Sequence, residues 1–126
     1  MKINLGIPIV VKIKVQGILD FRELDVILDT GARYTTISWD IAKDIGYDPA
    51  ISKRRVSVTT ANGVIEVPLI TVQSISLREL KVDSIEVTCL DIPELAGIKG
   101  LLGLSFLGKM RTYIDYKRNI LEIEDP

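Results

Sequence analysis

Residues 25–38 read DVILDTGARYTTIS, an apolar run that ends in the Asp-Thr-Gly triplet 29–31. The three apolar residues before Asp29 predict the end of a buried strand. An ionised carboxylate in such a place is costly unless it is paired or hydrogen-bonded, which favours a functional role for Asp29. The alternative is a plain turn, in which Asp29 caps local N–H groups and Gly31 takes a conformation that other residues resist.

The length and charge of the chain limit the kinds of active site and partner that are possible. With 126 residues, the chain is expected to form a single domain, residues 1–126, which is too short for a two-lobed enzyme. An active site that needs two lobes must therefore recruit a second chain. The formal net charge is -1 and no Lys or Arg block occurs, so we expect no nucleic-acid partner.

The available catalytic groups are few. The chain has no His, which excludes Ser-His, Cys-His and His-metal arrangements. Cys89 is the single cysteine, so no internal disulfide can form, and its alternating apolar surroundings favour a small, inert core residue. Acid chemistry must therefore come from Asp or Glu, and we expect neither a metal ion nor a cofactor.

The N-terminal stretch MKINLGIPIVVKIKV resembles a signal peptide only superficially. Lys12 and Lys14 interrupt the apolar run, and no small-residue cleavage site follows. No other segment approaches the roughly 20 apolar residues that a membrane-spanning helix needs. We therefore expect a cytoplasmic protein without a membrane partner.

The first half of the chain predicts strands around one short helix. Alternation at 7–15 and the extended run 21–30 predict a hairpin that leads into the triplet. A helix is expected after Ser38, which can cap it, and should end near Gly46.

A second hairpin is expected within residues 56–72. Asn62 and Gly63 favour a two-residue type I′ turn, because both residue types accept positive φ. Pro68 lacks an N–H, so its arm should lie at a sheet edge or stand free of the sheet.

The second half of the chain continues in strands. Residues 75–90 supply two strand candidates, and 97–110 supply an apolar strand followed by a short helix from Ser105. Residues 111–124 should form a hairpin with its turn near 117–119. Many strands with two short helices and no βαβ rhythm predict an all-β fold, a partly closed barrel.

Three motifs in this order carry a resemblance to a known family. ILDTGA at 27–32, the hairpin TTANGVIEV at 59–67 and GLLGLSFL at 100–107 resemble the retropepsin-like aspartic proteases, particularly their small cellular and prokaryotic relatives. The similarity covers nearly the whole chain. It implies a retropepsin-like barrel of one lobe that dimerises.

The resemblance also assigns roles by position. It implies that Asp29 is the catalytic aspartate, that Thr30 braces the two active-site loops across a dimer, and that Gly31 helps to hold the substrate backbone. The implied substrate-binding residues are Ala32, Arg33, Ala61, Asn62 and Gly63, of which the last three belong to a flap over the substrate. Leu101, Leu102 and Gly103 match a structural strand beneath the triplet.

Arg33 departs from the family pattern, which often has a small or acidic residue after Asp-Thr-Gly-Ala. Its guanidinium has two possible roles: an internal pair with an Asp or Glu that fixes the loop, which we favour, or a contact with a substrate carboxylate.

Because the chain contains a single Asp-Thr-Gly, the resemblance implies a homodimer in which Asp29 of each subunit meets on the two-fold axis. The expected activity is that of an aspartic endopeptidase, with a peptide or an unfolded protein as substrate. One alternative is a non-catalytic homodimeric peptide-binding or assembly module on the same fold. Another is a phosphate loop of the actin and hexokinase type, although those folds need two α/β lobes and far more chain.

Overall fold

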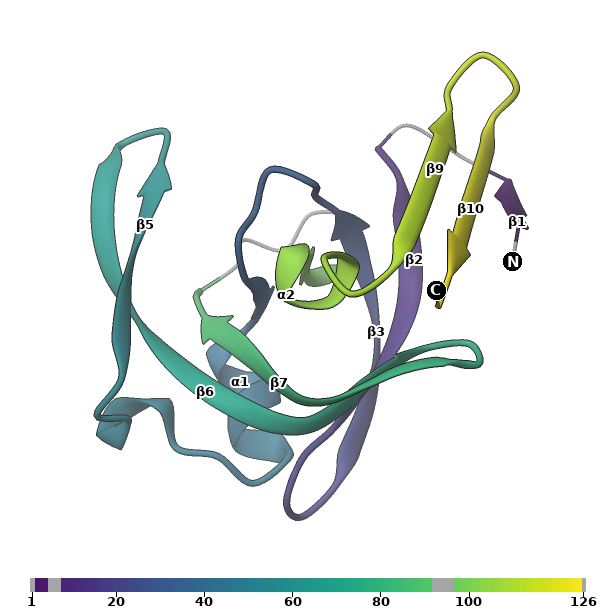
Figure 1. Cartoon of the computed structure of the whole chain (residues 1–126). Coiled ribbons are helices and arrows are strands. Elements are labelled where there is room, and N and C mark those ends of the chain that lie inside the picture. The colour runs from purple at the N-terminus through teal and green to yellow at the C-terminus, as the bar shows by residue number, and fades with distance from the viewer. Residues whose placement is uncertain (1, 5–7, 92–96, 126) are drawn as a thin grey trace.

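The computed structural model describes residues 2–4, 8–91 and 97–125, and the chain in these ranges is mainly β-sheet (Figure 1). The strands are β1 (Lys2–Asn4), β2 (Val10–Gln16), β3 (Phe21–Leu28), β4 (Thr35–Ile37), β5 (Arg55–Thr60), β6 (Gly63–Leu77), β7 (Leu80–Cys89), β8 (Ile98–Leu102), β9 (Arg111–Asp115) and β10 (Ile120–Glu124). The helices are α1 (Trp39–Asp44), the 3-10 turn η1 (Pro49–Ile51) and α2 (Leu104–Leu107).

Seven strands form one curled sheet in the order β2-β3-β8-β4-β7-β6-β5. An additional pairing of β2 with β6 joins two members of this sheet into a ring, from which β5 is left outside (Figure 1). Only residues 14–16 of β2 take part in that pairing, with 74–76 of β6, so the barrel is closed along part of its length. The predicted partly closed all-β barrel is confirmed.

The first hairpin forms as its alternation predicts. Val11, Ile13 and Val15 of β2 point into the core, whereas Lys12 and Lys14 are exposed on the opposite face. β2 pairs in antiparallel register with β3 along its whole length. The expected strand began at residue 7, which lies outside the described residues.

The predicted helix is present as α1. The Ser38 hydroxyl accepts a hydrogen bond from the Ile41 N–H at 3.2 Å, which is the expected N-cap. Gly46, at φ +108°, ends the helical segment in the left-handed region. Ala42 and Ile45 bury the inner face of this segment against the barrel core.

The second hairpin is also present, but its turn differs from the predicted type I′. Thr60 pairs with Gly63, so the two turn residues are Ala61 and Asn62, and Asn62 is not among the residues with positive φ. Among residues 60–63, only Gly63 takes positive φ, +120°. Glycine accepts this conformation with less strain than asparagine, so the chain places the left-handed residue just after the turn.

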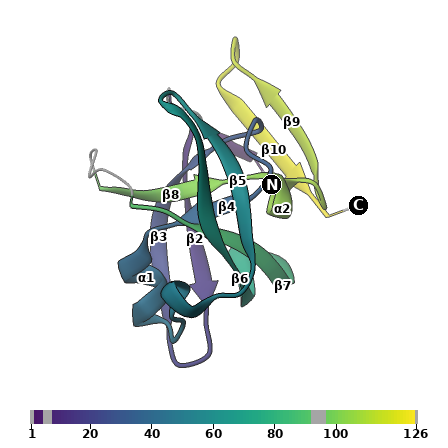
Figure 2. The same cartoon turned by 90° about the vertical axis from the view of Figure 1, so that its left-hand side faces the viewer.

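The arm that contains Pro68 stands free of the barrel as expected. Residues 63–68 of β6 pair with β5, and pairing with β7 begins only at Leu69. Pro68 is thus the last residue before β6 joins the ring. In Figure 2 the β5–β6 hairpin rises in front of β4 and β8.

The remaining strands complete a second, three-stranded sheet. β9 and β10 form the predicted hairpin, with residues 116–119 in its turn, and β1 pairs with β10. Leu121 and Ile123 of β10 join the same hydrophobic core as the barrel. α2 begins at Leu104, one residue before the predicted Ser105.

Cys89 lies fully buried in this core, and burial raises the pKa of its thiol to about 12. It is therefore the inert core residue that the sequence predicted. The two α-helices, of six and four residues, cannot form the helical layers of an α/β lobe, which removes the basis for the phosphate-loop alternative. Within the described ranges, no helix is both long and apolar enough to cross a bilayer.

Candidate active site

The triplet occupies the loop that leaves the end of β3. Leu28 closes the buried strand, and the N–H of Asp29 donates to the Leu102 carbonyl of β8 at 2.9 Å. The Asp29 carboxylate is half-buried, and its Oδ1 accepts a hydrogen bond from the Gly31 N–H at 3.0 Å. The backbone of this loop therefore holds the carboxylate at the mouth of the barrel.

The start of α2 supports the loop from below. The Leu104 N–H donates to the Ala32 carbonyl at 2.8 Å. Gly103 lies so close that a Cβ there would stand 2.4 Å from the Tyr34 carbonyl oxygen and 2.7 Å from that of Ala32. No larger residue fits at Gly103 unless the loop moves, which explains the glycine of the LLG motif in steric terms.

A hydroxyl network fixes the far end of the loop. The Thr35 N–H donates to the Ser105 Oγ at 2.9 Å, and the Gly103 N–H donates to the Thr35 Oγ1 at 3.1 Å. The two hydroxyls lie 3.0 Å apart. Thr35 is fully buried, so these bonds satisfy polar groups that would otherwise be left without partners.

A second pair of hydroxyls lies in the cleft wall. The Oγ1 atoms of Thr36 and Thr88 are 2.8 Å apart and buried. The roles of Thr35, Thr36, Thr88 and Ser105 were not predicted from the sequence. Their partners lie 52 to 70 residues away, and the only local signal was an unusual pair of Thr residues on a short buried strand.

The loop borders a cleft of about 580 Å³ between the barrel and the β5–β6 hairpin. Its lining residues are Asp29, Gly31, Ala32, Arg33, Tyr34, Thr36, Val56, Ser57, Val58, Thr59, Thr88, Leu90 and Leu101. In Figures 1 and 2 the tip of this hairpin and the loop after β3 lie at the same end of the molecule. The cleft is partly open to solvent, and its lining is both polar and apolar.

Four of the predicted site residues meet at this cleft: Asp29, Gly31, Ala32 and Arg33. The predicted flap residues, 61–63, lie instead at the exposed tip of the hairpin and do not line the cleft. Residues 56–59 of β5 line it in their place, which alternation alone could not reveal. Thr30 is exposed at the top of its loop.

The conformation of Gly31 tests whether the triplet is only a plain turn. Gly31 is not among the glycines with positive φ, and a Cβ there would make one ordinary contact, 3.4 Å from the Asp29 Oδ1. Neither backbone strain nor crowding within the protomer requires glycine at this position. The plain-turn reading therefore accounts for Asp29 but not for Gly31.

Arg33 does not form the favoured internal pair within the described part of the chain. Its guanidinium lies over the Tyr34 ring, 5.6 Å from the ring centroid, and no ion pair joins it to a described carboxylate. The side chain is exposed at the edge of the cleft. No described carboxylate is thus available for the internal pair. The other role, a contact with a substrate carboxylate, agrees with the position of Arg33 at the cleft.

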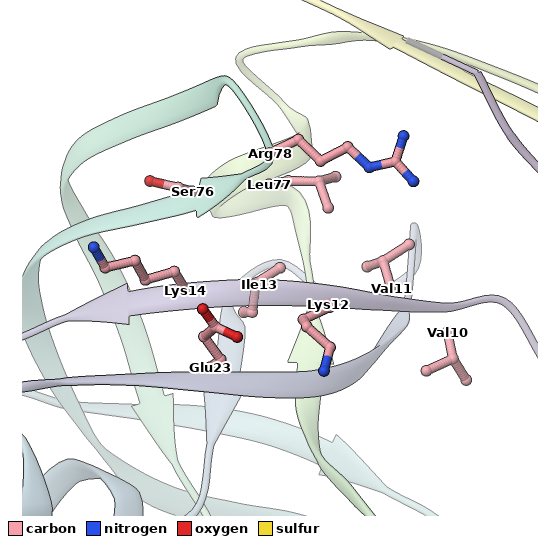
Figure 3. A pocket seen from close by; sticks show the side chains of 9 residues that line it. All are labelled: Val10, Val11, Lys12, Ile13, Lys14, Glu23, Ser76, Leu77 and Arg78. Carbon is pink, nitrogen blue, oxygen red and sulfur yellow. The ribbon is translucent and has the colours of Figure 1, made fainter.

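A second hollow, of about 650 Å³, lies between β2 and the end of β6, away from the triplet. Figure 3 shows Lys12, Lys14 and Arg78 around it, with their charged ends pointing apart instead of toward a common point. Lys12 is also paired with Asp25 at 3.8 Å, and Lys14 lies over the Phe21 ring. This arrangement does not form an anion site, and we assign it no chemistry.

Comparison with known families matches residues 15–109 to the model described as "gag-polyprotein putative aspartyl protease". A relative from Sinorhizobium sp., described as an uncharacterized protein in the cobV 5′ region, is 32% identical over 92 residues. That match covers 73% of this chain and 39% of the relative, so the chain spans about two fifths of the relative's length.

Two solved structures share the fold. A retropepsin-like aspartic protease from Rickettsia conorii superposes with a TM-score of 0.72 at 22% identity, covering 98% of this chain and 88% of that one. The protease of simian foamy virus (mac) superposes with a TM-score of 0.52 at 16% identity, covering 79% and 91% of the two chains. The retropepsin-like fold predicted from the three motifs is confirmed.

Proposed function

Because the chain belongs to the gag-polyprotein aspartyl protease family, we propose that it is an aspartic endopeptidase, active as a homodimer with Asp29 of each subunit at its centre. The observation that carries the proposal is the half-buried Asp29 carboxylate, held by the loop backbone at the floor of an open cleft. One protomer supplies one such carboxylate, and hydrolysis of a peptide bond needs an acid and a base. A second copy supplies the missing group.

The two carboxylates would share one proton when they meet, which is an established property of aspartic proteases. The ionised carboxylate takes a proton from a water molecule while the oxygen of that water attacks the carbonyl carbon of the peptide bond. The protonated member gives its proton to the carbonyl oxygen. The tetrahedral gem-diol then collapses: one of its hydroxyls returns a proton to the ionised carboxylate, the C–N bond breaks, and the amine leaves with the proton that the other carboxylate took from water.

Two exposed features of the protomer support a dimer. The Thr30 side chain reaches no hydrogen-bond partner among the described residues and stands exposed beside Asp29, where an acceptor in the loop of the second subunit could accept a hydrogen bond from its hydroxyl. Gly31 is exposed, and a Cβ there would meet only the Asp29 Oδ1, at 3.4 Å. Both properties suit a site completed by a second subunit and by substrate backbone.

The β5–β6 hairpin is the natural cover for this site. Its arm pairs with no strand of the barrel before Leu69, and Val64 and Ile65 near its tip are exposed apolar residues. We propose that both hairpins of the dimer close over an extended peptide, exclude water and contribute backbone hydrogen bonds. Residues 61–63 would then contact the substrate in the closed state, although they do not line the cleft in the structure described here.

The decisive experiment compares the wild-type protein with Asp29→Asn on an unfolded protein substrate from pH 3 to 8, with fragments identified by mass spectrometry. We expect the wild type to cleave best on the acid side of neutral, because the proposed mechanism requires one of the two carboxyl groups to carry a proton. Asp29→Asn should lose about 10³-fold or more of the activity.

Analytical ultracentrifugation of both proteins supplies the control, since the asparagine is nearly isosteric and should leave the dimer intact. Cleavage that persists in Asp29→Asn, or that keeps rising above pH 8, would contradict the proposal. A wild-type dimer that binds peptides without cutting them would instead support a non-catalytic peptide-binding module on this fold.

A further inference from the structure

The charged side chains that line the cleft number two among the described residues, Asp29 and Arg33. Asp29 is committed to the chemistry in the proposed function, which leaves Arg33 as the group that can distinguish one substrate charge from another. Its guanidinium is exposed at the edge of the cleft, and its recorded contact is with the Tyr34 ring. Stacking on a ring leaves the in-plane N–H donors of a guanidinium directed outward, toward an acceptor.

The backbone on both sides of Arg33 is fixed. On one side the Ala32 carbonyl accepts from the Leu104 N–H at 2.8 Å, and on the other the Thr35 N–H donates to the Ser105 Oγ at 2.9 Å. Arg33 therefore stands on a loop whose backbone is hydrogen-bonded on both sides. A donor placed on a rigid support loses less conformational entropy when it binds, which suits it to recognition.

A neighbouring hollow extends the positive character of this edge. Arg33 and Tyr34 also line a depression of about 430 Å³ whose other charged residues are Glu86 and Lys109. Glu86 is already paired with Arg54 of the chain segment before β5. Lys109 adds a second cation, so the uncompensated charge of the depression is positive.

We infer that Arg33 selects substrates that carry an Asp or Glu side chain near the scissile bond, a specificity that rests on the proposed protease function. Arg binds carboxylates through two parallel N–H···O bonds, which gives the contact both strength and direction. The two-fold axis of a homodimer repeats Arg33 on both sides of the dyad. The acidic preference should therefore occur on either side of the cleaved bond.

The probes are fluorescent, C-terminally amidated apolar decapeptides that carry one Glu, moved through the eight central positions, each paired with its Gln counterpart. Amidation removes the terminal carboxylate, so any preference reports the side chain. For the wild type we expect kcat/KM to be about three- to tenfold higher for Glu than for Gln at one or more positions on each side, the range for a partly exposed charge pair. Binding of the same peptides to the dimeric Asp29→Asn variant should show the same preference by fluorescence anisotropy.

The test variant is Arg33→Gln, and Lys117→Gln, in the exposed turn between β9 and β10, is the matched control that removes the same charge elsewhere. Arg33→Gln should reduce the Glu-to-Gln ratio to about one, while Lys117→Gln keeps the wild-type ratio. Arg33→Glu should invert the ratio.

Two results would overturn the inference. If Arg33→Gln weakens Glu and Gln peptides equally, or weakens the dimer, then Arg33 has a structural role, such as a pair with a carboxylate of the second subunit. A wild-type ratio near one at every position, in cleavage and in binding, would also exclude it. Absence of cleavage together with a retained Glu preference in binding would reject the protease proposal and keep the role of Arg33.

Discussion

At the scale of single residues, substitution of two glycines of the site by alanine should have opposite effects on stability and on activity. A Cβ at Gly31 would meet nothing closer than 3.4 Å, whereas a Cβ at Gly103 would stand 2.4 Å from the Tyr34 carbonyl oxygen. We expect Gly103→Ala to lower the free energy of unfolding by about 1–3 kcal/mol, because backbone has to shift. Gly31→Ala should change it by less than about 0.5 kcal/mol.

Urea unfolding of both variants tests this difference, and cleavage assays give it functional meaning. Gly31→Ala should still lower kcat/KM about tenfold or more, because the added methyl group would occupy space needed by substrate or by the second subunit. A stable Gly31→Ala protein with full activity would show that the glycine has no role in the completed site.

Cys89 makes a prediction about alkaline stability. Its pKa rises from 9.0 to about 12 in the folded chain because burial disfavours the thiolate. Below pH 9 both the folded and the unfolded states carry the neutral thiol, so ionisation of Cys89 does not lower the free energy of unfolding there. Between about pH 9 and 12 the unfolded thiol ionises while the folded one does not, so the free energy of unfolding falls as the pH rises.

The measurement compares wild type with Cys89→Ala by urea unfolding from pH 7.5 to 10.5. The alanine creates a small cavity, so the wild type should be the more stable protein at pH 7.5, and this advantage should shrink by roughly 1–2 kcal/mol by pH 10.5. Tyr47, whose pKa burial also raises, is present in both proteins and its contribution cancels. A difference that stays constant across this range would show that the thiol is accessible to solvent.

At the scale of elements, the sequence predicted what depends on local pattern. The hairpins of β2–β3 and β9–β10 and the capped helix α1 follow from alternation, turn residues and Ser38, and all three are present. The turn between β5 and β6 was misassigned by one residue. Asn-Gly accepts two positive φ values in isolation, but the observed pairing of Thr60 with Gly63 uses the glycine alone.

The support of the candidate site could not be predicted for a different reason. Thr35 and Ser105 are ordinary polar residues in the sequence, and they become a network only because α2 returns beneath the loop 70 residues later. Likewise, residues 56–59 line the cleft because the hairpin folds back toward the loop after β3. Contacts between distant segments are set by the closure of the barrel, and periodicity carries no information about them.

At the scale of the whole molecule, the proposed activity needs Asp29 from two subunits, and this can be tested by mixing subunits. A fixed concentration of wild type is combined with an equal concentration of Asp29→Asn and allowed to exchange. The mixture contains twice as many dimers as the wild type alone, and random pairing makes a quarter of them wild-type homodimers. Half of the original number of wild-type dimers therefore remains. If a mixed dimer is inactive, activity should fall to about half that of the wild type alone.

A ninefold excess of Asp29→Asn should reduce activity to about one tenth, because nearly every wild-type chain then has an inactive partner. A variant that cannot dimerise should leave the rate unchanged at any ratio, which makes it the control for nonspecific effects of added protein. Diluting the wild type below its dimer dissociation constant should lower the rate with the square of concentration. If activity instead stays proportional to the wild-type concentration in both experiments, a single protomer carries the chemistry, and Asp29 must then find its acid partner within its own chain.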